Sequence, residues 1–433
     1  MNQPGLRQVQ YLVFCFSFLV AVADGFDQTI VSIVGPVIVK SGVIGLNDLG
    51  FVFFAGLIGY VPGSFLLGAA ADRWGRRPLI VIALFILAVG SAGTALSRSL
   101  GELFIARFVT SLGIGGAAPC LIALAAEYSP RRLRTFIVAL MWAGIPFGGI
   151  LSGLTASIWL ARLGWEAMFG IAAACTVLLA VIVQLVVPES PEFLVVKGGR
   201  EDAVRNILER LGGGTCDEPL APVPTPLEAP SSPKELFAAG FVRGTTALWI
   251  AMFAGFMQLI MISQYTPILL QIAGMRADDS GKVFTLFYVG SIVGTALAGP
   301  AIARVDGCKA TAGWLVAAGA ATAFFGGFAS TVDRALVGIT LVGLLQGLGL
   351  GALIAISASL YPAHIRSTGF GWAVGVSRLG GAAAPLLAAQ LVSRHTTQVA
   401  FYMVVASIAL LAALAVWFIS AERSPRDASL SSR

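Results

Sequence analysis

Residues 9–39 read VQYLVFCFSFLVAVADGFDQTIVSIVGPVIV, an almost wholly apolar run interrupted by Asp24 and Asp27. A helix that crosses a bilayer needs about 20 apolar residues, so this run is long enough to span a membrane. The two carboxylates lie three residues apart, on one helical face, with about 5–6 Å between their Cβ atoms. Ionisable residues inside spans are costly and usually functional. We interpret Asp24 and Asp27 as proton carriers; a structural pair neutralised by a basic partner stays open.

The composition indicates a polytopic membrane protein. Hydrophobic residues make up 57% of the 433 positions and charged residues 12%, against about 25% charged in soluble domains. The net charge of +6 does not indicate a nucleic-acid partner, because the basic residues flank apolar runs, where anionic lipid headgroups attract them. No cleavable signal peptide is evident. The five cysteines have no CxxC spacing, which indicates neither a disulfide framework nor a metal site.

The lengths of the apolar runs, and the polar breaks between them, predict an all-α protein with twelve spans. The expected spans are 10–36, 48–71, 78–97, 101–126, 135–160, 166–187, 243–271, 281–303, 310–329, 335–359, 369–392 and 398–420. With the N-terminus inside, inside segments hold 19 of the 28 Lys and Arg, outside connectors hold 7, and Arg107 and Arg378 fall within spans. Because basic loops stay inside, both termini are expected to be cytoplasmic.

The polar break between the sixth and seventh spans predicts a hinge between two halves. We expect an N-terminal six-helix half at 1–187, a cytoplasmic linker at 188–242, a C-terminal six-helix half at 243–421 and a tail at 422–433. Apolar positions in 201–211 have helical spacing, so the linker should contain an amphipathic helix.

Two landmarks recur between the halves at nearly constant offset. The stretch Gly68-Ala-Ala-Ala-Asp72-Arg73 corresponds to Gly299-Pro-Ala-Ile-Ala303-Arg304 at a shift of 231. Tyr128, with a threonine seven residues on, corresponds to Tyr361 with the same spacing, at a shift of 233. A constant offset argues for a duplicated six-span unit, which makes the halves pseudo-symmetric.

The connector after the second span, Gly68-x-x-x-Asp72-Arg73-x-Gly75-Arg76-Arg77-Pro78, has a specific spacing. Gly68 permits close helix approach, Gly75 a tight reversal, and Pro78 suits the first turn of a helix. The arginines serve either as topology signals or as a charge cluster that forms in one state and breaks in another. This pattern resembles the signature loop of the major facilitator superfamily, which implies that fold. Ala303 replaces the expected Asp in the second copy.

Within that superfamily the chain resembles the aromatic acid:proton symporter family. The residues that carry this resemblance are Asp24–Asp27, Arg107–Gly116, Ala126–Thr135, Tyr361–Gly369 and Gly375–Gly380. Residues Pro188–Glu192 resemble the sugar-porter relatives instead, which usually have Arg where this chain has Glu192. The resemblance implies a monomeric, proton-coupled importer of a small aromatic carboxylate in the bacterial inner (plasma) membrane. It implies no cofactor other than protons as the coupling ion.

The two arginines within spans are the candidate anion-binding groups. An arginine fork matches a carboxylate bidentately and does not release its proton. None of the last six expected spans contains an acidic residue, so we expect a substrate carboxylate to pair with Arg378. Arg107 is either an internal partner of Asp24 or Asp27, or it modulates the proton site or serves as a second anchor.

Further polar and aromatic residues in the spans are candidates for the substrate site or for the gate. Gln258 and Tyr265 lie seven apart on one face and are suited to ring hydroxyls, unless they are ordinary packing residues. Gln264, Trp142 and Phe26 are further candidates for polar or stacking contacts. The expected cytoplasmic gate comprises Asp72, Arg73, Arg76, Arg77, Glu127, Arg134 and Arg366. Within it we expect Glu127 to pair with Arg73 or Arg134, although plain solvated loop charges explain these residues too.

These observations favour a proton-coupled importer of a benzoate- or hydroxybenzoate-type acid that works by alternating access. The alternative is a sugar, polyol or other organic-ion transporter of the same fold; the Pro188–Glu192 stretch supports a sugar, whereas Arg378 argues against a neutral one. We do not expect an enzyme, because the sequence lacks HExxH, a metal cluster, a nucleophile with a base and an aspartate-rich phosphate motif. A ligand sensor that does not transport is a further alternative, but no attached signalling domain supports it.

Overall fold

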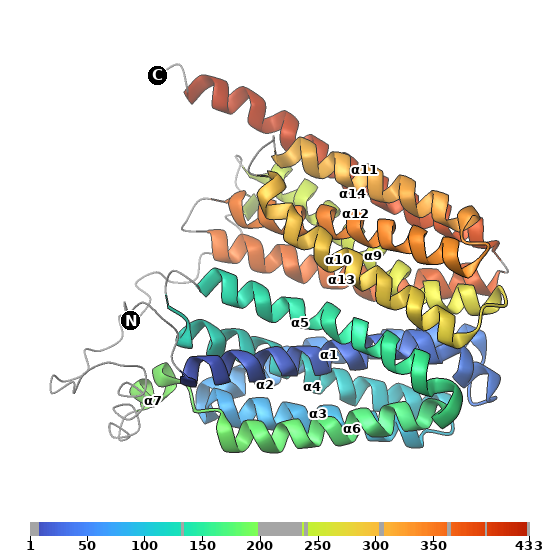
Figure 1. Ribbon diagram of the computed structural model, residues 1–433. Helices are drawn as coiled ribbons and strands as arrows, with labels where there is room; N and C mark the ends of the chain where they lie inside the picture. The colour runs from blue at the N-terminus through green and yellow to red at the C-terminus, as the bar shows by residue number, and fades with distance from the viewer. Residues whose placement is uncertain are drawn as a thin grey trace. The chain divides into compact units, whose positions relative to one another are not determined.

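The computed structural model describes residues 8–130, 134–197, 236–237, 241–302, 307–361, 365–394 and 396–430. Within these residues the secondary structure is helical and contains no strand (Figure 1). The expected amphipathic helix at 201–211 and the stretch around Ala303 lie outside the described residues, as do the side chains of Asp72, Trp142, Arg134 and Arg366.

The chain forms two compact units. The first comprises Met1–Gln28, Ala55–Gly149 and Arg162–Leu227, and the second Thr29–Phe54, Ile150–Ala161 and Glu228–Arg433. Each unit takes parts of helices that the sequence assigns whole to one half, since α1 changes unit after Gln28. The division at 187 and 243 stays a prediction.

Long helices follow one another with short connectors. They are α1 (Gln8–Lys40), α2 (Leu49–Trp74), α3 (Arg76–Leu96), α4 (Leu100–Tyr128), α5 (Arg134–Thr155), α6 (Ala161–Val186), α9 (Val242–Ile272), α10 (Ala277–Ile302), α11 (Gly307–Phe328), α12 (Val332–Ser359), α13 (Arg366–Ser393) and α14 (Gln398–Leu430). A short helix, α7 (Pro191–Lys197), follows α6. Helices suit these apolar runs because a helix satisfies its own backbone hydrogen bonds where lipid offers no partner.

In the described part of the chain, eleven helical stretches are long and apolar enough to cross a membrane. The expected count was twelve, and the difference lies in one continuous stretch, Ala143–Val186, of 44 residues. A π-helical turn at Ala156–Leu160 joins α5 to α6 without a loop. The break falls instead at Gly164, whose φ of 78° and ψ of 173° are not helical. Forty-four residues are about twice the length of one span, so this stretch holds most of both expected spans, 135–160 and 166–187.

The helix boundaries follow the capping and turn signals in the sequence. Ser99 caps α4 by accepting from the Glu102 N–H, and Thr331 caps α12 by accepting from the Arg334 N–H. Gly75 alone separates α2 from α3, and its φ of 104° is a conformation that glycine adopts at low cost. The tight reversal expected there is confirmed. At the other end of the chain, α14 extends to Leu430, beyond the expected span end at 420.

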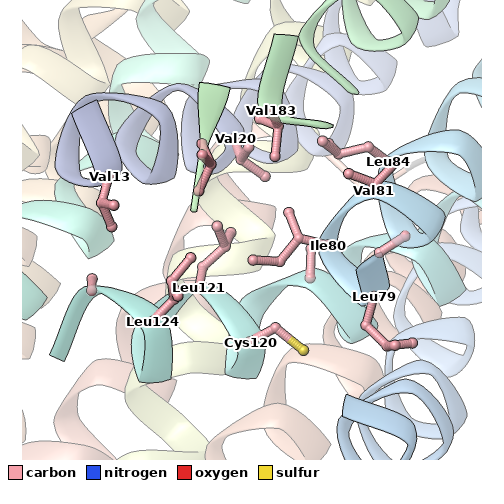
Figure 2. Close-up of a cluster of buried hydrophobic side chains, with 14 of the residues drawn as sticks. Val13, Val20, Leu79, Ile80, Val81, Leu84, Cys120, Leu121, Leu124 and Val183 are labelled. Carbon is pink, nitrogen blue, oxygen red and sulfur yellow. The ribbon is translucent and has the colours of Figure 1, made fainter. Parts of the chain in front are cut away.

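Each unit has an apolar core. In the first unit, α1, α3, α4 and α6 contribute buried side chains, as Figure 2 shows around Ile80, Leu121 and Val183. In the second unit, a core cluster joins α9, α11, α12 and α14 around Leu248, Leu315 and Leu353. Because lipid is as apolar as these side chains, close packing supplies much of the helix–helix attraction inside a membrane.

Glycines let α2 and α4 approach closely in the first unit. A Cβ atom at Gly59 would lie 2.3 Å from the Phe108 carbonyl oxygen, and one at Gly63 would lie 2.1 Å from that of Leu112. From the other side, a Cβ at Gly115 would lie 2.1 Å from the Tyr60 carbonyl oxygen. Real Cβ atoms do not approach backbone this closely, so the crossing requires glycine.

The second unit repeats this crossing between α10 and α12. A Cβ added at Gly290 would lie 2.4 Å from the Thr340 carbonyl oxygen. A Cβ added at Gly294 would lie 2.0 Å from the Leu344 carbonyl oxygen. Gly290 and Gly294 lie 231 residues after Gly59 and Gly63. The offset matches that of the Gly68–Arg73 landmark, so the duplicated unit inferred from the sequence has equivalent packing in both copies.

We predict that Gly63→Val destabilises the protein by about 1–3 kcal/mol or more, because the added side chain must displace backbone at the α2–α4 crossing. The measurement is the melting temperature of the purified protein in detergent. Gly170→Val on α6 is the matched control, because nothing lies within 4 Å of a Cβ added there. Equal melting temperatures for the two variants would contradict this view of the crossing.

Candidate functional site

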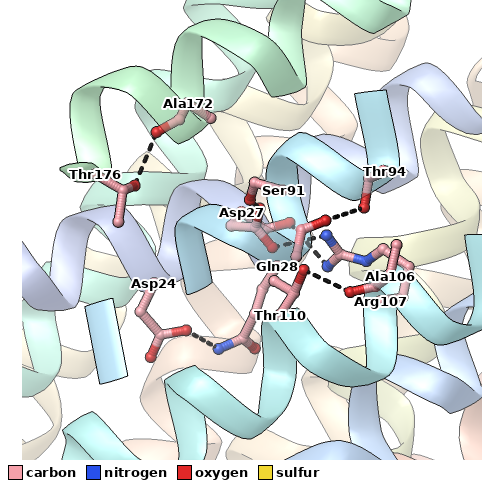
Figure 3. Close-up of polar contacts among 11 residues, drawn as sticks. Asp24, Asp27, Gln28, Ser91, Thr94, Ala106, Arg107, Thr110, Ala172 and Thr176 are labelled. Carbon is pink, nitrogen blue, oxygen red and sulfur yellow. Dashed lines mark hydrogen bonds and ion pairs between the residues drawn. The ribbon is translucent and has the colours of Figure 1, made fainter. Parts of the chain in front are cut away.

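An ion pair between α1 and α4 lies in the interior of the first unit. Arg107 Nη1 donates to Asp27 Oδ2 at 2.7 Å, and Arg107 Nη2 donates to the Asp27 backbone carbonyl at 3.2 Å. Ser91, on α3, donates its hydroxyl to the other carboxylate oxygen of Asp27 (Figure 3). Asp27 is 2% exposed and Arg107 3%. Both charges are therefore removed from water and depend on one another.

Close helix contacts bring these three side chains together. A Cβ at Gly90 on α3 would lie 2.4 Å from the Thr110 nitrogen on α4, so the two helices nearly touch. Thr110 uses its hydroxyl to bond the Ala106 carbonyl of its own helix, which leaves Ser91 as the hydroxyl that reaches the acid (Figure 3). The Arg107 guanidinium also lies 5.9 Å from the centre of the Phe169 ring, a cation–π distance.

Asp24 has a different environment from Asp27. It is 9% exposed and accepts a hydrogen bond from Gln28 Nε2, one turn further along α1 (Figure 3). It also lines a cavity of about 40 Å³ formed by α1, α4 and α5. Apart from Asp24 and Ser17, the lining is apolar. This volume exceeds the 10–15 Å³ or so that a water molecule requires, so water and protons can be accommodated beside the carboxyl group.

The structure therefore separates two acids that the sequence suggested as one pair. Asp27 is held by a permanent cation, since arginine keeps its proton under all ordinary conditions. Asp24 faces a cavity and has a neutral amide as its hydrogen-bond donor. Among the interpretations of Arg107 that the sequence left open, the contacts are those of an internal partner of Asp27.

The candidate anion anchor and two amides lie in the second unit. Arg378 lies near the middle of α13 and is half-buried. Gln258 on α9 is 0% exposed, and among the described residues neither atom of its side-chain amide has a hydrogen-bond partner. Gln264, further along α9, likewise has a buried amide oxygen without a partner in the described part of the chain.

Tyr265 is occupied by contacts within the second unit. Its hydroxyl donates to the Pro385 carbonyl oxygen at 3.0 Å, and its ring stacks on Phe401 with centroids 6.1 Å apart. The side chain is 2% exposed. The hydroxyl proton of Tyr265 is thus already donated within the protein, and the side chain packs in the interior. In the first unit, Phe26 is half-buried on α1.

Two of the expected gate residues, Arg76 and Glu127, form an ion pair near the α2–α3 turn. Glu127 pairs with Arg76, the first residue of α3. Ser190, which precedes α7, donates its hydroxyl to the same Glu127 carboxylate. The pairing of Glu127 with Arg73 or Arg134 expected from the sequence stays a prediction.

Sequence reasoning missed the role of Glu189 in this cluster. Its carboxylate accepts hydrogen bonds from the backbone N–H groups of Arg76 at 2.9 Å and Arg77 at 3.1 Å. These are the first N–H groups of α3, where a negative charge is favourable. The absence of an N-cap side chain at Gly75 was the signal, because the helix start then needs an acceptor from elsewhere.

The two tyrosines of the internal repeat are both buried and act as hydrogen-bond donors. The Tyr128 hydroxyl donates to the Glu189 carbonyl at 2.8 Å, and the Tyr361 hydroxyl lies 3.1 Å from Thr245 Oγ1. Burial raises the pKa of Tyr361, partly offset by the Thr245 hydrogen bond. Tyr361 thus stays protonated and able to donate.

Comparison with known proteins gives a consistent assignment. A sequence model of the Major Facilitator Superfamily matches residues 17–281 and 248–433. A 4-hydroxybenzoate transporter of Acinetobacter baylyi is 27% identical over 96% of this chain and 91% of its own length. A gallate transporter of Pseudomonas putida is 26% identical, covering 96% of this chain and 92% of the relative.

Solved structures show the same fold. The partially occluded, inward-open xylose transporter XylE of E. coli has a TM-score of 0.70 and 19% identity, with 94% of this chain and 97% of that chain covered. The long apolar helices, the duplicated glycine crossings and the family match therefore agree. This chain belongs to the major facilitator superfamily.

Proposed function

We propose that the protein is a proton-coupled secondary transporter that imports a small aromatic carboxylate of the benzoate or hydroxybenzoate type. Relatives that span more than nine-tenths of this chain are named for 4-hydroxybenzoate and gallate, which supports the substrate class. The observation that carries the coupling is the pair of buried acids on α1: one is ion-paired with Arg107, and the other lines a cavity. Ionisable groups at such positions commonly form proton relays.

In the proposed cycle, proton and substrate favour the same conformational switch. Asp24 or Asp27 takes a proton in the outward-facing state, which removes a buried charge. Asp24 is the better carrier, because Asp27 would have to leave Arg107 with an uncompensated charge. The substrate carboxylate pairs with Arg378, and neutralising both sites gives access to the inward-facing state. Coupling requires only that each ligand stabilise the same state.

The topology proposed for this cycle is that expected from the sequence. Two six-helix halves rock about the 188–242 linker, with the protein in the bacterial inner membrane as a monomer and both termini cytoplasmic. The Arg76–Glu127 pair and the Glu189 cap tie α3, α4 and the segment after α6 together. We propose that this cluster is formed in one state of the gate and broken in the other.

A sugar or polyol substrate receives less support. The likeness to the xylose transporter XylE, at 19% identity, shows the fold alone. Arg378, half-buried in the middle of α13, is a cation suited to a carboxylate and not to a neutral sugar.

We predict that Asp27→Asn abolishes uphill uptake of labelled benzoates into proteoliposomes driven by a pH gradient. The change also leaves Arg107 buried without its carboxylate, which should cost about 3–5 kcal/mol of stability. The double variant Asp27→Asn/Arg107→Gln should regain part of the lost melting temperature without regaining accumulation. Undiminished uphill uptake by folded Asp27→Asn protein would refute the role of this acid.

We predict that Asp24→Asn uncouples transport, because an asparagine can still accept the Gln28 hydrogen bond but cannot carry a proton. Counterflow exchange of substrate should persist, whereas accumulation driven by a pH gradient should fall at least about tenfold, as loss of 1.4 kcal/mol or more of coupling implies. Ser17→Ala, which alters the same cavity without removing a titratable group, is the control. Normal pH-driven accumulation by Asp24→Asn would assign the proton elsewhere.

We predict that Arg378→Gln weakens binding of benzoates by at least about tenfold, since a charge-assisted pair is among the stronger hydrogen bonds. Competition measurements with benzoates and with glucose, in wild type and variant, check this. Arg394→Gln at the end of the same helix removes an exposed arginine and should leave binding unchanged. If glucose competed and benzoates did not, the alternative substrate class would replace the proposed one.

A further inference from the structure

Two glutamines of the second unit, Gln258 and Gln346, have hydrogen-bonding groups that the described protein does not use. Both side chains are 0% exposed. Three of their four amide atoms lack a partner among the described residues: both atoms of Gln258 and the oxygen of Gln346. A buried polar group without a partner costs about 1–3 kcal/mol. Such groups are rare in native structures and call for an explanation, such as a bound ion or water.

The two amides lie on facing sides of α9 and α12. Gln346 Nε2 donates to the Gly255 carbonyl oxygen at 3.3 Å, and Gly255 lies three residues before Gln258, on the same helical face. A Cβ at Gly255 would lie 2.9 Å from the Leu350 side chain of α12. Short connectors reverse the chain between α9 and α12 three times, so these helices are antiparallel. One turn beyond the Gly255–Leu350 contact, Gln258 and Gln346 therefore lie at the same level.

The internal repeat shows that this position corresponds to that of the ion pair. In the first unit, a Cβ added at Gly148 would lie 2.2 Å from the Val22 carbonyl oxygen. In the second unit, a Cβ added at Gly380 would lie 2.1 Å from the Phe253 carbonyl oxygen. These contacts are offset by 232 and 231 residues. At the offset of 231, Asp27 corresponds to Gln258. The first unit fills this position with a satisfied carboxylate, and the second fills it with an amide that has no partner among the described residues.

Arg378 lies within reach of the same region. The Gly380–Phe253 contact places α13 beside α9, and the two helices run in the same direction, because four chain reversals separate them. Arg378 precedes this contact by two residues and Gln258 follows it by five, an axial separation of about 10 Å by helical rise. A long arginine side chain and a single aromatic ring can together bridge this separation. One end of the ligand is then anionic and the other is a neutral hydrogen-bonding group.

We propose that Gln258 and Gln346 form a subsite that binds the ring hydroxyl of a hydroxylated aromatic acid whose carboxylate pairs with Arg378. This inference rests on the proposed function and names the determinant of specificity within it. An amide oxygen accepts from the phenolic hydroxyl, and an amide N–H donates to it. A site built around such groups rejects an analogue without the hydroxyl, because its buried polar atoms then stay unpaired. Gln258 is a candidate from the sequence, whereas only the structure points to Gln346.

The test compares binding of benzoate with that of its three monohydroxylated isomers, by calorimetry on the purified full-length protein. Wild type should prefer one hydroxylated isomer to benzoate by about tenfold or more. Gln346→Met, which keeps the side-chain length without the amide, should reduce that preference to within about twofold, because the hydroxylated isomer loses its hydrogen-bond partner and benzoate has none to lose. The melting temperature should change little, because the change removes the unpaired amide oxygen together with the long hydrogen bond to the Gly255 carbonyl. Gln390→Leu, an exposed glutamine on α13, is the control and should keep the preference.

Three outcomes would overturn the proposal. A preference that survives Gln346→Met and Gln258→Met shows that the amides do not contact the hydroxyl. Equal losses for benzoate and the hydroxylated isomers, with a lower melting temperature, show a structural role such as holding a buried water. Binding of no aromatic acid by wild type would reject the proposed function itself, and is distinguishable because it precedes any comparison of variants.

Discussion

The buried pair of Asp27 and Arg107 imposes the main constraint on the first unit. A carboxylate and a guanidinium that are almost fully removed from water are each costly alone and tolerable together. Their contact requires α1, α3 and α4 to meet at fixed levels, because Ser91 must also reach the carboxylate. The apolar surroundings make the attraction between the two charges strong. For the same reason, a change in the charge of either group changes the free energy of the structure by a large amount. A switch that alters the charge on α1 is for this reason able to bias the packing of several helices.

Close packing in both units depends on glycine, and the repeated crossings explain why. At the α2–α4 and α10–α12 crossings, backbone carbonyl groups of one helix occupy the space where a side chain of the other would begin. Helices in a membrane gain little from hydrophobic burial against one another, so close contact is a principal source of attraction. Equivalent glycines at an offset of 231 residues show that duplication copied this packing along with the chain.

The two copies differ where chemistry requires it. The position that holds Asp27 in the first unit holds Gln258 in the second, and the cluster of Arg76, Glu127 and Glu189 lies in the first unit. The second unit has Arg378 in the middle of α13, and the buried amides of Gln258 and Gln346 have atoms without a hydrogen-bond partner among the described residues. In the proposed function, proton handling falls to the first copy and recognition of the organic anion to the second.

The sequence by itself determined the membrane class, the helical runs, the internal repeat and the family, because run length, glycine spacing and charge position are local properties of the chain. It also identified Asp24, Asp27, Arg107 and Gln258 as unusual, since polar residues stand out in apolar runs. Only the tertiary structure decided the partners: Arg107 for Asp27, Arg76 for Glu127, and the Gly255 carbonyl for Gln346. It also decided that α5 and α6 join through a π-helical turn with the break at Gly164. Partners between helices depend on the rotation and depth at which the helices cross, which no local pattern specifies.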